Sequence, residues 1–241
     1  MSACIQYATF HHCITHGRFH VRIRLMKYLM LIIFFISTGI HLYASLKQDK
    51  PLRDKTKPFI LLSLLGFYCF SVDKIVWTVV LALIFSWIGD ILLIPKGVKW
   101  FTAGGISFMI SHFFFVLSYS KYVDFSAISR IFLIGLPLLF VVTSAVIFKY
   151  LRPHLPKALF YPMLLYLIIN GTMNCFAWFR SLSCTGAASV ITAIGALLFY
   201  ISDTSLFFVR FNKNSRLKTH FLVMLTYSIG ELLIVLGLIM G

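Results

Sequence analysis

The sequence predicts an all-α protein, a polytopic membrane bundle of helices, and three observations lead to this fold class. The chain is 60% hydrophobic and only 12% charged, and its mean hydropathy of +0.91 lies far above that of soluble domains. Its apolar runs are each near the roughly 20 residues that a helix needs to cross a bilayer. The runs are uniformly apolar rather than alternating, which argues against the strands of a membrane barrel.

Taken in order, the apolar runs predict eight transmembrane helices. The second span is short, and Asp73 and Lys74 leave only a tight turn before the third, which predicts a tilted hairpin. Residues 1–25 lack an apolar pattern and are expected to form a basic, disordered tail, so that residues 26–241 form the transmembrane domain. The expected spans are 26–45, 58–72, 75–94, 101–119, 127–149, 157–178, 187–209 and 219–240.

The charge distribution predicts how the chain sits in its membrane. The net charge of +15 comes from Lys and Arg clustered between the apolar runs, which indicates loops on anionic lipid headgroups rather than a nucleic-acid interface. The connections that follow the first, third, fifth and seventh spans carry most of these cations, so these connections are expected in the cytosol and both termini outside it. In a bacterium the membrane would be the inner membrane. The five cysteines lack the spacing of a zinc site, and neither a metal nor an oligomeric state is indicated.

Two similar segments, 83–93 and 196–206, each place an aspartate inside an apolar run. A carboxyl at membrane depth costs roughly 2.5–3.5 kcal/mol on insertion scales, so Asp90 and Asp203 are expected to face a bundle interior or a wet cavity. Each lies six or seven residues before a basic loop, which puts both about 10 Å below the same membrane face. If the chain is a parallel repeat of four plus four spans, the two aspartates face each other across one cavity open to the cytoplasmic side.

Further polar residues fall in the predicted spans. Glu231 lies one turn after Tyr227 in the eighth span, and a carboxyl at that depth should be protonated or hydrogen-bonded to an amide or imidazole of another span. Such residues face a cavity or neighbouring helices, and they either serve a site or only join helices. The other members of this group are His112 in the fourth span and Tyr166, Asn170 and Asn174, spaced by four, in the sixth.

A series of short motifs runs in order along about 185 residues, from Lys57 to the C-terminus. They are Lys57-Pro58, Phe85-Ser86-x-x-Gly89-Asp90-x-Leu92-Leu93, Gly104, Ser111-His112, Tyr166, Met173, Gly195-Ala196-Leu197-Leu198-Phe199-x-x-Ser202-Asp203-x-x-Leu206 and Thr226-Tyr227. In these motifs the chain resembles the YhhN-like lysoplasmalogenase family. It departs from the family at Glu231, where relatives usually have Gln, and at Ser111, where they have Ala before the His.

The resemblance implies an eight-helix hydrolase that cleaves the vinyl ether bond of lysoplasmalogens without a metal or organic cofactor. Protonating the β-carbon of a vinyl ether gives an oxocarbenium ion that water captures, and two carboxyls suit this chemistry as they do glycoside hydrolysis. Asp90 and Asp203 are the expected catalytic pair, sharing a proton, with either one as the acid. The expected substrate-binding residues are His112, Tyr166, Asn170, Asn174, Tyr227 and Glu231, with Lys57 and loop cations on the lysophospholipid phosphate.

Two other functions fit the same residues. Paired intramembrane carboxyls with an internal repeat also describe a proton-coupled transporter, although the two aspartates are shallow and their spans lack central breaks. A non-catalytic lipid-binding protein of the same fold is the other alternative. The sequence contains neither a Gly-x-Ser-x-Gly elbow nor a His-Glu-x-x-His zinc helix, which excludes the best-known membrane hydrolase motifs.

Overall fold

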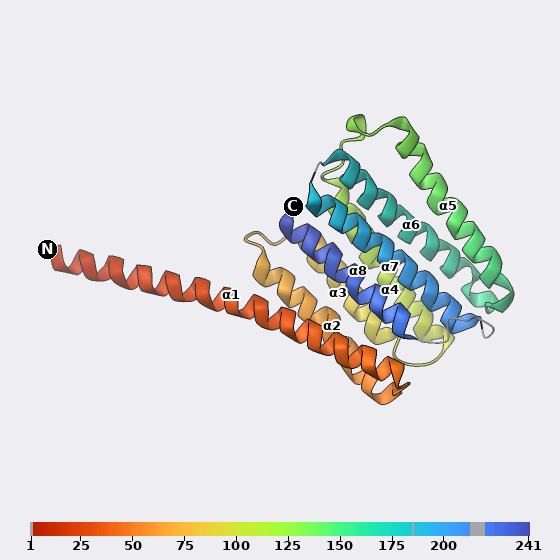
Figure 1. Ribbon diagram of the computed structural model, residues 1–241, viewed down its shortest axis with the longest axis horizontal. Helices are drawn as coiled ribbons and strands as arrows, with labels where there is room; N and C mark the ends of the chain where they lie inside the picture. The colour runs from red at the N-terminus through yellow and green to blue at the C-terminus, as the bar shows by residue number, and fades with distance from the viewer. Residues whose placement is uncertain (1, 185, 213–219) are drawn as a thin grey trace.

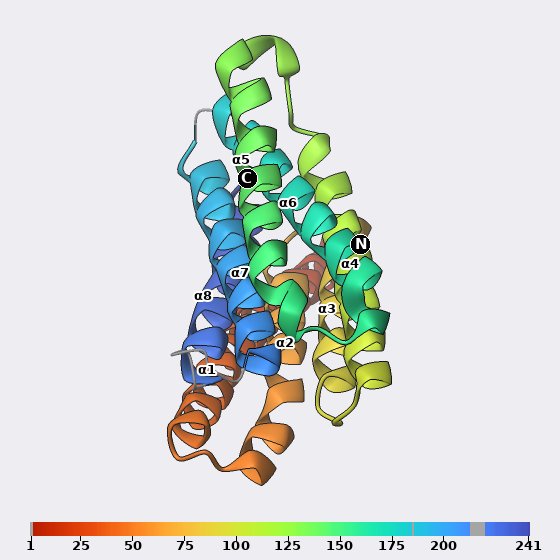
Figure 2. The same cartoon turned by 90° about the vertical axis from the view of Figure 1, so that its right-hand side faces the viewer.

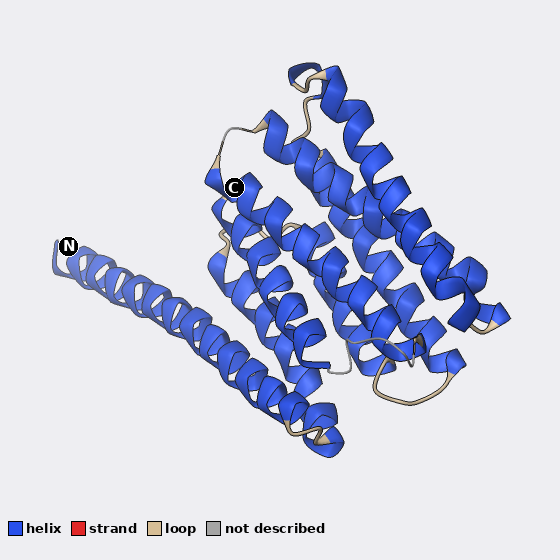
Figure 3. Cartoon of the chain, turned by 45° about the vertical axis from the view of Figure 1, so that its right-hand side comes forward, coloured by secondary structure: helices blue, strands red, loops and turns tan. Residues whose placement is uncertain are grey.

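The computed structural model describes residues 2–184, 186–212 and 220–241, with side chains from residue 24 onward. Within these ranges the chain forms α-helices and short 3₁₀ turns and no strand, as the all-α prediction required. Short loops join antiparallel neighbours into one bundle (Figures 1 and 3). The elements are α1 (Ser2–Leu46), α2 (Lys50–Ser71), α3 (Trp77–Leu92), α4 (Val98–Ser120), η1 (Phe125–Ala127), α5 (Arg130–Leu151), η2 (Arg152–His154), η3 (Lys157–Leu159), α6 (Phe160–Ser183), α7 (Ala187–Phe211) and α8 (His220–Met240).

The protein is a multi-pass integral membrane protein. Six segments of the described chain are long and apolar enough to cross a bilayer: Arg24–Leu46, Val98–Ser120, Arg130–His154, Lys157–Ser183, Ala187–Phe211 and His220–Met240. Each of the eight predicted spans corresponds to a helix, but α3 has only 16 residues and α2 begins with a charged stretch. The disordered tail over 1–25, the orientation and the four-plus-four repeat stay predictions, and α1 is continuous from Ser2.

Helix α2 begins about two turns earlier than the sequence predicted, at Lys50 instead of residue 58. Asp49 caps it by accepting a hydrogen bond from the backbone N–H of Leu52 at 3.1 Å, and Pro51 occupies the first turn, where its missing N–H costs nothing. These local signals extend the helix over a polar stretch that the sequence analysis treated as loop. Consequently Arg53 and Lys57 lie one turn apart on a helix, in fixed positions relative to α3.

The helices pack most closely as the pairs α1 with α2, α3 with α4, and α7 with α8. Helix α5 lies at the edge opposite α1 (Figures 1 and 2), and only Phe140, Ser144 and Leu151 of its residues are buried, so most of its surface faces lipid. The buried core lies between the other helices. It holds Leu64, Leu83, Phe115, Phe199 and Ile234, none of which is measurably exposed.

Glycines set the closest approach between α7 and α8. A Cβ atom on Gly230 would lie 2.9 Å from the carbonyl oxygen of Gly195, and one on Gly195 would lie 2.7 Å from the carbonyl oxygen of Gly230. Backbones at this distance leave no room for a side chain, as at the small-residue interfaces of other membrane helices. This contact fixes α8 against α7 and brings Tyr227 and Asp203 to the same end of the bundle.

The first prediction concerns this contact. Gly230→Ala should lower the free energy of unfolding by about 1–2 kcal/mol, because the added methyl group overpacks the interface by more than the gain in helix propensity offsets. Thermal unfolding of the purified protein in detergent measures the change. The matched control is Gly39→Ala, where a Cβ would meet nothing within 4 Å, and this variant should be as stable as the wild type or slightly more so. Equal melting temperatures for all three proteins would contradict the packing argument.

Candidate active site

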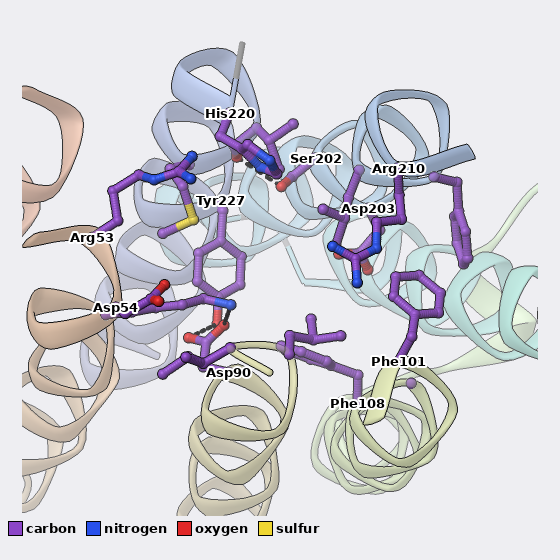
Figure 4. A pocket seen from close by; sticks show the side chains of 18 of the residues that line it. Arg53, Asp54, Asp90, Phe101, Phe108, Ser202, Asp203, Arg210, His220 and Tyr227 are labelled. Carbon is purple, nitrogen blue, oxygen red and sulfur yellow. Dashed lines mark hydrogen bonds and ion pairs between the residues drawn. The ribbon is translucent and has the colours of Figure 1, made fainter. Parts of the chain in front are cut away.

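A cavity of about 290 Å³ opens at one end of the bundle. Its walls come from the C-terminal ends of α3 and α7, the loop after α3 and the N-terminal ends of α2, α4 and α8, with one residue each from α1 and α6 (Figure 4). Five of the nine residues that the sequence singled out line it: Lys57, Asp90, Tyr166, Asp203 and Tyr227. The two aspartates, 113 positions apart in the sequence, therefore share one cavity.

Asp90 is held as half of a buried ion pair. Its Oδ1 lies 3.1 Å from the Lys57 ammonium, and its Oδ2 accepts a hydrogen bond from the Tyr227 hydroxyl at 2.8 Å. The side chain of Asp90 is 3% exposed and that of Lys57 is 16% exposed. The indole N–H of Trp87 donates to the carbonyl oxygen of Pro58 at 2.9 Å, which joins α3 to α2 beside this pair. With a cation in contact, the ionised form of Asp90 is the one that this environment stabilises.

Asp203 has a different set of partners. The Tyr166 hydroxyl and the Asn170 amide both donate to its Oδ2, the amide at 2.9 Å. The neighbouring Ser202 donates to the carbonyl oxygen of Val223 at 2.8 Å and so ties this turn of α7 to α8. Within the described ranges no Lys or Arg forms an ion pair with Asp203, and no protein donor reaches its Oδ1. The two aspartates thus differ in charge compensation.

His112 lies outside the cavity wall, and its ring faces the carboxyl of Asp203. Its Nδ1 must carry a hydrogen, because it bonds to the carbonyl oxygen of Phe108, which can only accept. In the neutral ring Nε2 is then an acceptor, and it lies 3.7 Å from Asp203 Oδ2 with no hydrogen-bond partner of its own. Two acceptors facing each other at this distance repel unless one of them carries a proton. The geometry therefore favours one proton on the Asp203–His112 pair.

The other predicted residues lie outside the cavity wall. Asn170 reaches Asp203 from behind, and Asn174 donates to the carbonyl and side-chain oxygens of Asn170 at 3.0 and 3.2 Å. Glu231 is not exposed at all, and in the described part of the chain neither of its oxygens has a hydrogen-bond partner. Of the two alternatives expected for Glu231, a proton or a hydrogen bond to another span, the hydrogen bond to Asn170, Asn174 or His112 is not present. Their polar groups are committed to one another and to Asp203.

Ser86 also lies close to Glu231, one turn below Asp90 on α3. Its hydroxyl is paired with Ser111 of α4 at 2.7 Å, and it makes no well-formed hydrogen bond to the Glu231 carboxyl. An ionised carboxylate in such a site would be unusually costly. Glu231 therefore fits its surroundings as the neutral acid, close in shape and polarity to the Gln expected of relatives.

The cavity mouth is lined by cationic and imidazole side chains that the sequence analysis did not single out by number. Lys50 pairs with Asp54 at 3.3 Å, whereas Arg53, Lys96 and Arg210 have no carboxylate partner in the described residues. Figure 4 shows Arg53 and His220 on one side of the mouth and Arg210 on the other. The signal for Arg53 was its spacing of four from Lys57, which puts both on one face of a helix.

His41 is a second residue that sequence reasoning missed. It lines the cavity from α1, is 3% exposed, and shares a hydrogen bond of 3.0 Å with the Thr56 hydroxyl of α2. The rule that singled out the aspartates, a polar residue within an apolar span, would have found it. In the described residues no group of three or more His, Cys, Asp or Glu side chains could hold a metal ion.

Fold and cavity define the class of protein: a multi-pass helical membrane protein with two buried carboxyls in a cavity whose mouth is cationic. A model of the YhhN family matches residues 52–238, and the chain belongs to this family. The matched region begins on α2 next to Arg53 and includes all nine residues that the sequence singled out, whereas His41 and Lys50 of the cavity wall precede it. Comparisons with curated proteins and with solved structures give no match.

The second prediction concerns the ion pair. Lys57→Met should lower the free energy of unfolding by about 3–5 kcal/mol, because it leaves the Asp90 carboxylate buried without a cation. Adding Asp90→Asn to this variant should recover most of the loss, since the uncompensated charge is then gone. Thermal unfolding of the single and double variants measures both effects. Lys50→Met, which breaks the exposed pair with Asp54, is the control and should cost less than about 1 kcal/mol. A stable Lys57→Met protein would contradict the ion pair.

The third prediction concerns Glu231. Glu231→Gln and Glu231→Leu should both unfold within about 1 kcal/mol of the wild type, because no hydrogen bond to the protein is lost in either. Melting temperatures in detergent provide the comparison. A large fall for Leu without one for Gln would show that the carboxyl has a polar partner after all, such as a buried water.

Proposed function

We propose that this protein hydrolyses the vinyl ether bond of lysoplasmalogens, releasing a fatty aldehyde and a glycerophospho-head group. The observation that supports this function best is the unequal pair of carboxyls in one cavity, with Asp90 compensated by Lys57 and Asp203 held by neutral donors. An acid and a carboxylate on facing walls are what vinyl ether hydrolysis needs. The match to the YhhN family is consistent with this activity.

The reaction balances with water as the only co-substrate. A carboxylic acid transfers its proton to the β-carbon of the vinyl ether, and the ether oxygen then shares the positive charge of an oxocarbenium ion. Water adds to the α-carbon of this ion and loses a proton to a carboxylate. The resulting hemiacetal breaks its bond to the glycerol oxygen. That oxygen takes back the proton that water gave to the carboxylate, and the hemiacetal hydroxyl gives its proton to the group that acted as acid, so the aldehyde and a free glycerol hydroxyl form and both carboxyls return to their starting states. Proton transfer by a positioned group contributes typically 10²–10⁴-fold to such a rate.

Asp203 is the acid in this proposal. It has no cation in contact, and a proton on its carboxyl removes the negative charge that faces the Nε2 lone pair of His112. Tyr166 and Asn170 occupy Oδ2, which leaves Oδ1 as the oxygen that can hold the reactive hydrogen. His112 and Asn170 are positioning residues, because they act on the substrate only through Asp203.

Asp90 is the carboxylate. Lys57 keeps it ionised and Tyr227 fixes the orientation of Oδ2, so that its charge can stabilise the oxocarbenium ion and accept the proton of water. Lys57, which the sequence analysis assigned to the substrate phosphate, has this carboxylate as its partner instead. The phosphate is left to the unpaired cations Arg53, Lys96 and Arg210 at the mouth, of which the two arginines can bind it in bidentate fashion.

The fourth prediction tests this activity. Purified protein in liposomes should convert lysoplasmalogen, and not the matching ester lysolipid, to aldehyde. In D₂O each aldehyde molecule should carry one deuterium on the carbon next to the carbonyl, because the acid protonates that carbon. Asp90→Asn and Asp203→Asn should lose roughly 10²–10⁴-fold in rate per folded protein. Asp203→Asn should unfold normally, whereas Asp90→Asn should be less stable, because Lys57 keeps its charge without a partner. Asp124→Asn, an exposed carboxyl whose capping of Ser126 an amide can replace, is the matched control.

Three outcomes would contradict the proposal. Absence of aldehyde from the wild type would favour the transporter or the non-catalytic lipid-binding protein. Aldehyde without deuterium at that carbon would exclude the proton-transfer step. Near-full activity of either Asn variant would make that aspartate structural.

A further inference from the structure

A second, apolar cleft adjoins the carboxyl cavity on the side of α4 and α6. The two spaces share Phe101, Gly105, Tyr166 and Phe207, so they meet along one common wall. The remaining lining residues of the cleft are Thr102, Ile106, Met109, Leu159, Pro162 and Met163. Nearly all of these groups are hydrocarbon or thioether, in contrast to the cations at the cavity mouth. The cleft therefore suits an apolar ligand.

The cleft leads from the cavity toward the lipid-facing surface. Met163 is 2% exposed at its inner side, whereas Ile106 is 46% exposed on the outer surface of α4. The cleft is narrow, about 20 Å³, and two methionines line it. Methionine side chains are unbranched and readily change shape, so they can move aside to admit a methylene chain into this narrow cleft.

The adjacent glycines Gly104 and Gly105 of α4 have different roles beside the cleft. A Cβ on Gly104 would lie 2.9 Å from the Leu93 side chain, so this glycine allows α3 to pack against α4. A Cβ on Gly105 would meet no atom within 4 Å, although Gly105 lines both the cavity and the cleft. The missing side chain at residue 105 thus leaves the boundary between the two spaces open.

Tyr166 connects the cleft to the chemistry. Its ring lines the cleft and packs against Phe207 with centroids 5.5 Å apart, while its hydroxyl donates to Asp203. A chain in the cleft would therefore place its first carbons beside Asp203 and away from Asp90. In vinyl ether hydrolysis the acid must reach the carbon on the chain side of the bond, which is the carbon that this arrangement presents.

We propose that the cleft between α4 and α6 is the binding site for the single hydrocarbon chain of the substrate and its lateral passage to the bilayer. This inference rests on the proposed function for the identity of the chain. The cleft admits the chain from the leaflet on the cavity side, and the cationic mouth holds the head group. Product aldehyde leaves by the same route into the lipid.

Photo-crosslinking tests this site without requiring turnover. The probe is a non-hydrolysable lysophospholipid with a saturated ether bond and a diazirine in the middle of its chain, added to the purified protein in lipid nanodiscs. Labelling that excess unlabelled lysolipid competes away should map to residues 101–109 and 159–166 and to Phe207. Competed labelling only at residues outside the cleft, or none that is competed, would overturn the proposal.

Substitutions at glycine sharpen the test. Gly105→Leu fills the boundary and should weaken competed labelling about tenfold, the effect of excluding about two buried methylenes. Gly135→Leu on α5 is the matched control, because Gly135 is also a helical glycine with no atom within 4 Å of a Cβ, and its labelling should equal that of the wild type. Unchanged labelling in a folded Gly105→Leu protein would also overturn the proposal.

The labelling experiment tests the cleft separately from the hydrolase activity. Competed labelling in the cleft without aldehyde release would leave a chain-binding site in a protein that is not this hydrolase. Aldehyde release with competed labelling elsewhere would keep the hydrolase and overturn the cleft as its chain site.

Discussion

The buried ion pair between Lys57 and Asp90 is the interaction on which the rest of the site depends. A lone carboxylate at this depth in an apolar bundle would be very costly, and the ammonium 3.1 Å away compensates it. The pair exists because α2 begins at Lys50, with Asp49 as its cap, and because Trp87 bonds to the backbone of α2 at Pro58. A local feature at the start of one helix therefore determines the protonation state of a carboxyl on another.

The same pair makes the two aspartates unequal. Asp203 has a tyrosine, an amide and an imidazole around it in place of a cation, so the cavity offers a proton on one wall and a negative charge on the other. The apolar cleft adjoins the cavity on the side of Asp203, and Tyr166 lines both the cavity and the cleft. Charge and shape thus impose the same orientation on a single-chain lipid. A substrate bound in reverse would put its chain among the cations of the mouth.

Much of the fold and part of the site could be predicted from the sequence. Apolar runs located eight helices, and the cost of an aspartate in such a run singled out Asp90 and Asp203, because these signals depend on each segment alone. The partners of the aspartates could not be predicted in this way. Lys57 looked like a loop cation since helix propensity is a weak signal beside a charged stretch, and its partner depends on how α2 packs against α3.

Glu231 shows that depth in the membrane does not identify the partner of a polar side chain. Its placement in the membrane predicted either a proton or a partner, and several polar residues on other spans were available as partners. The structure pairs those residues with one another and with Asp203, so the carboxyl is left without one in the described chain. Which polar groups meet inside a bundle is decided by rotation and close packing of helices, such as the glycine contact between α7 and α8, and not by depth alone.

At neutral pH Asp203 should carry a proton while Asp90 does not. Infrared difference spectroscopy measures this directly, because a protonated carboxyl has a carbonyl stretch that a carboxylate lacks. The measurement uses Glu231→Gln as the background, so that the neutral acid at residue 231 does not contribute. The spectrum should contain a protonated-carboxyl band that Asp203→Asn removes and Asp90→Asn leaves in place. A band that disappears with Asp90→Asn and persists in Asp203→Asn would show that Asp90 holds the proton instead.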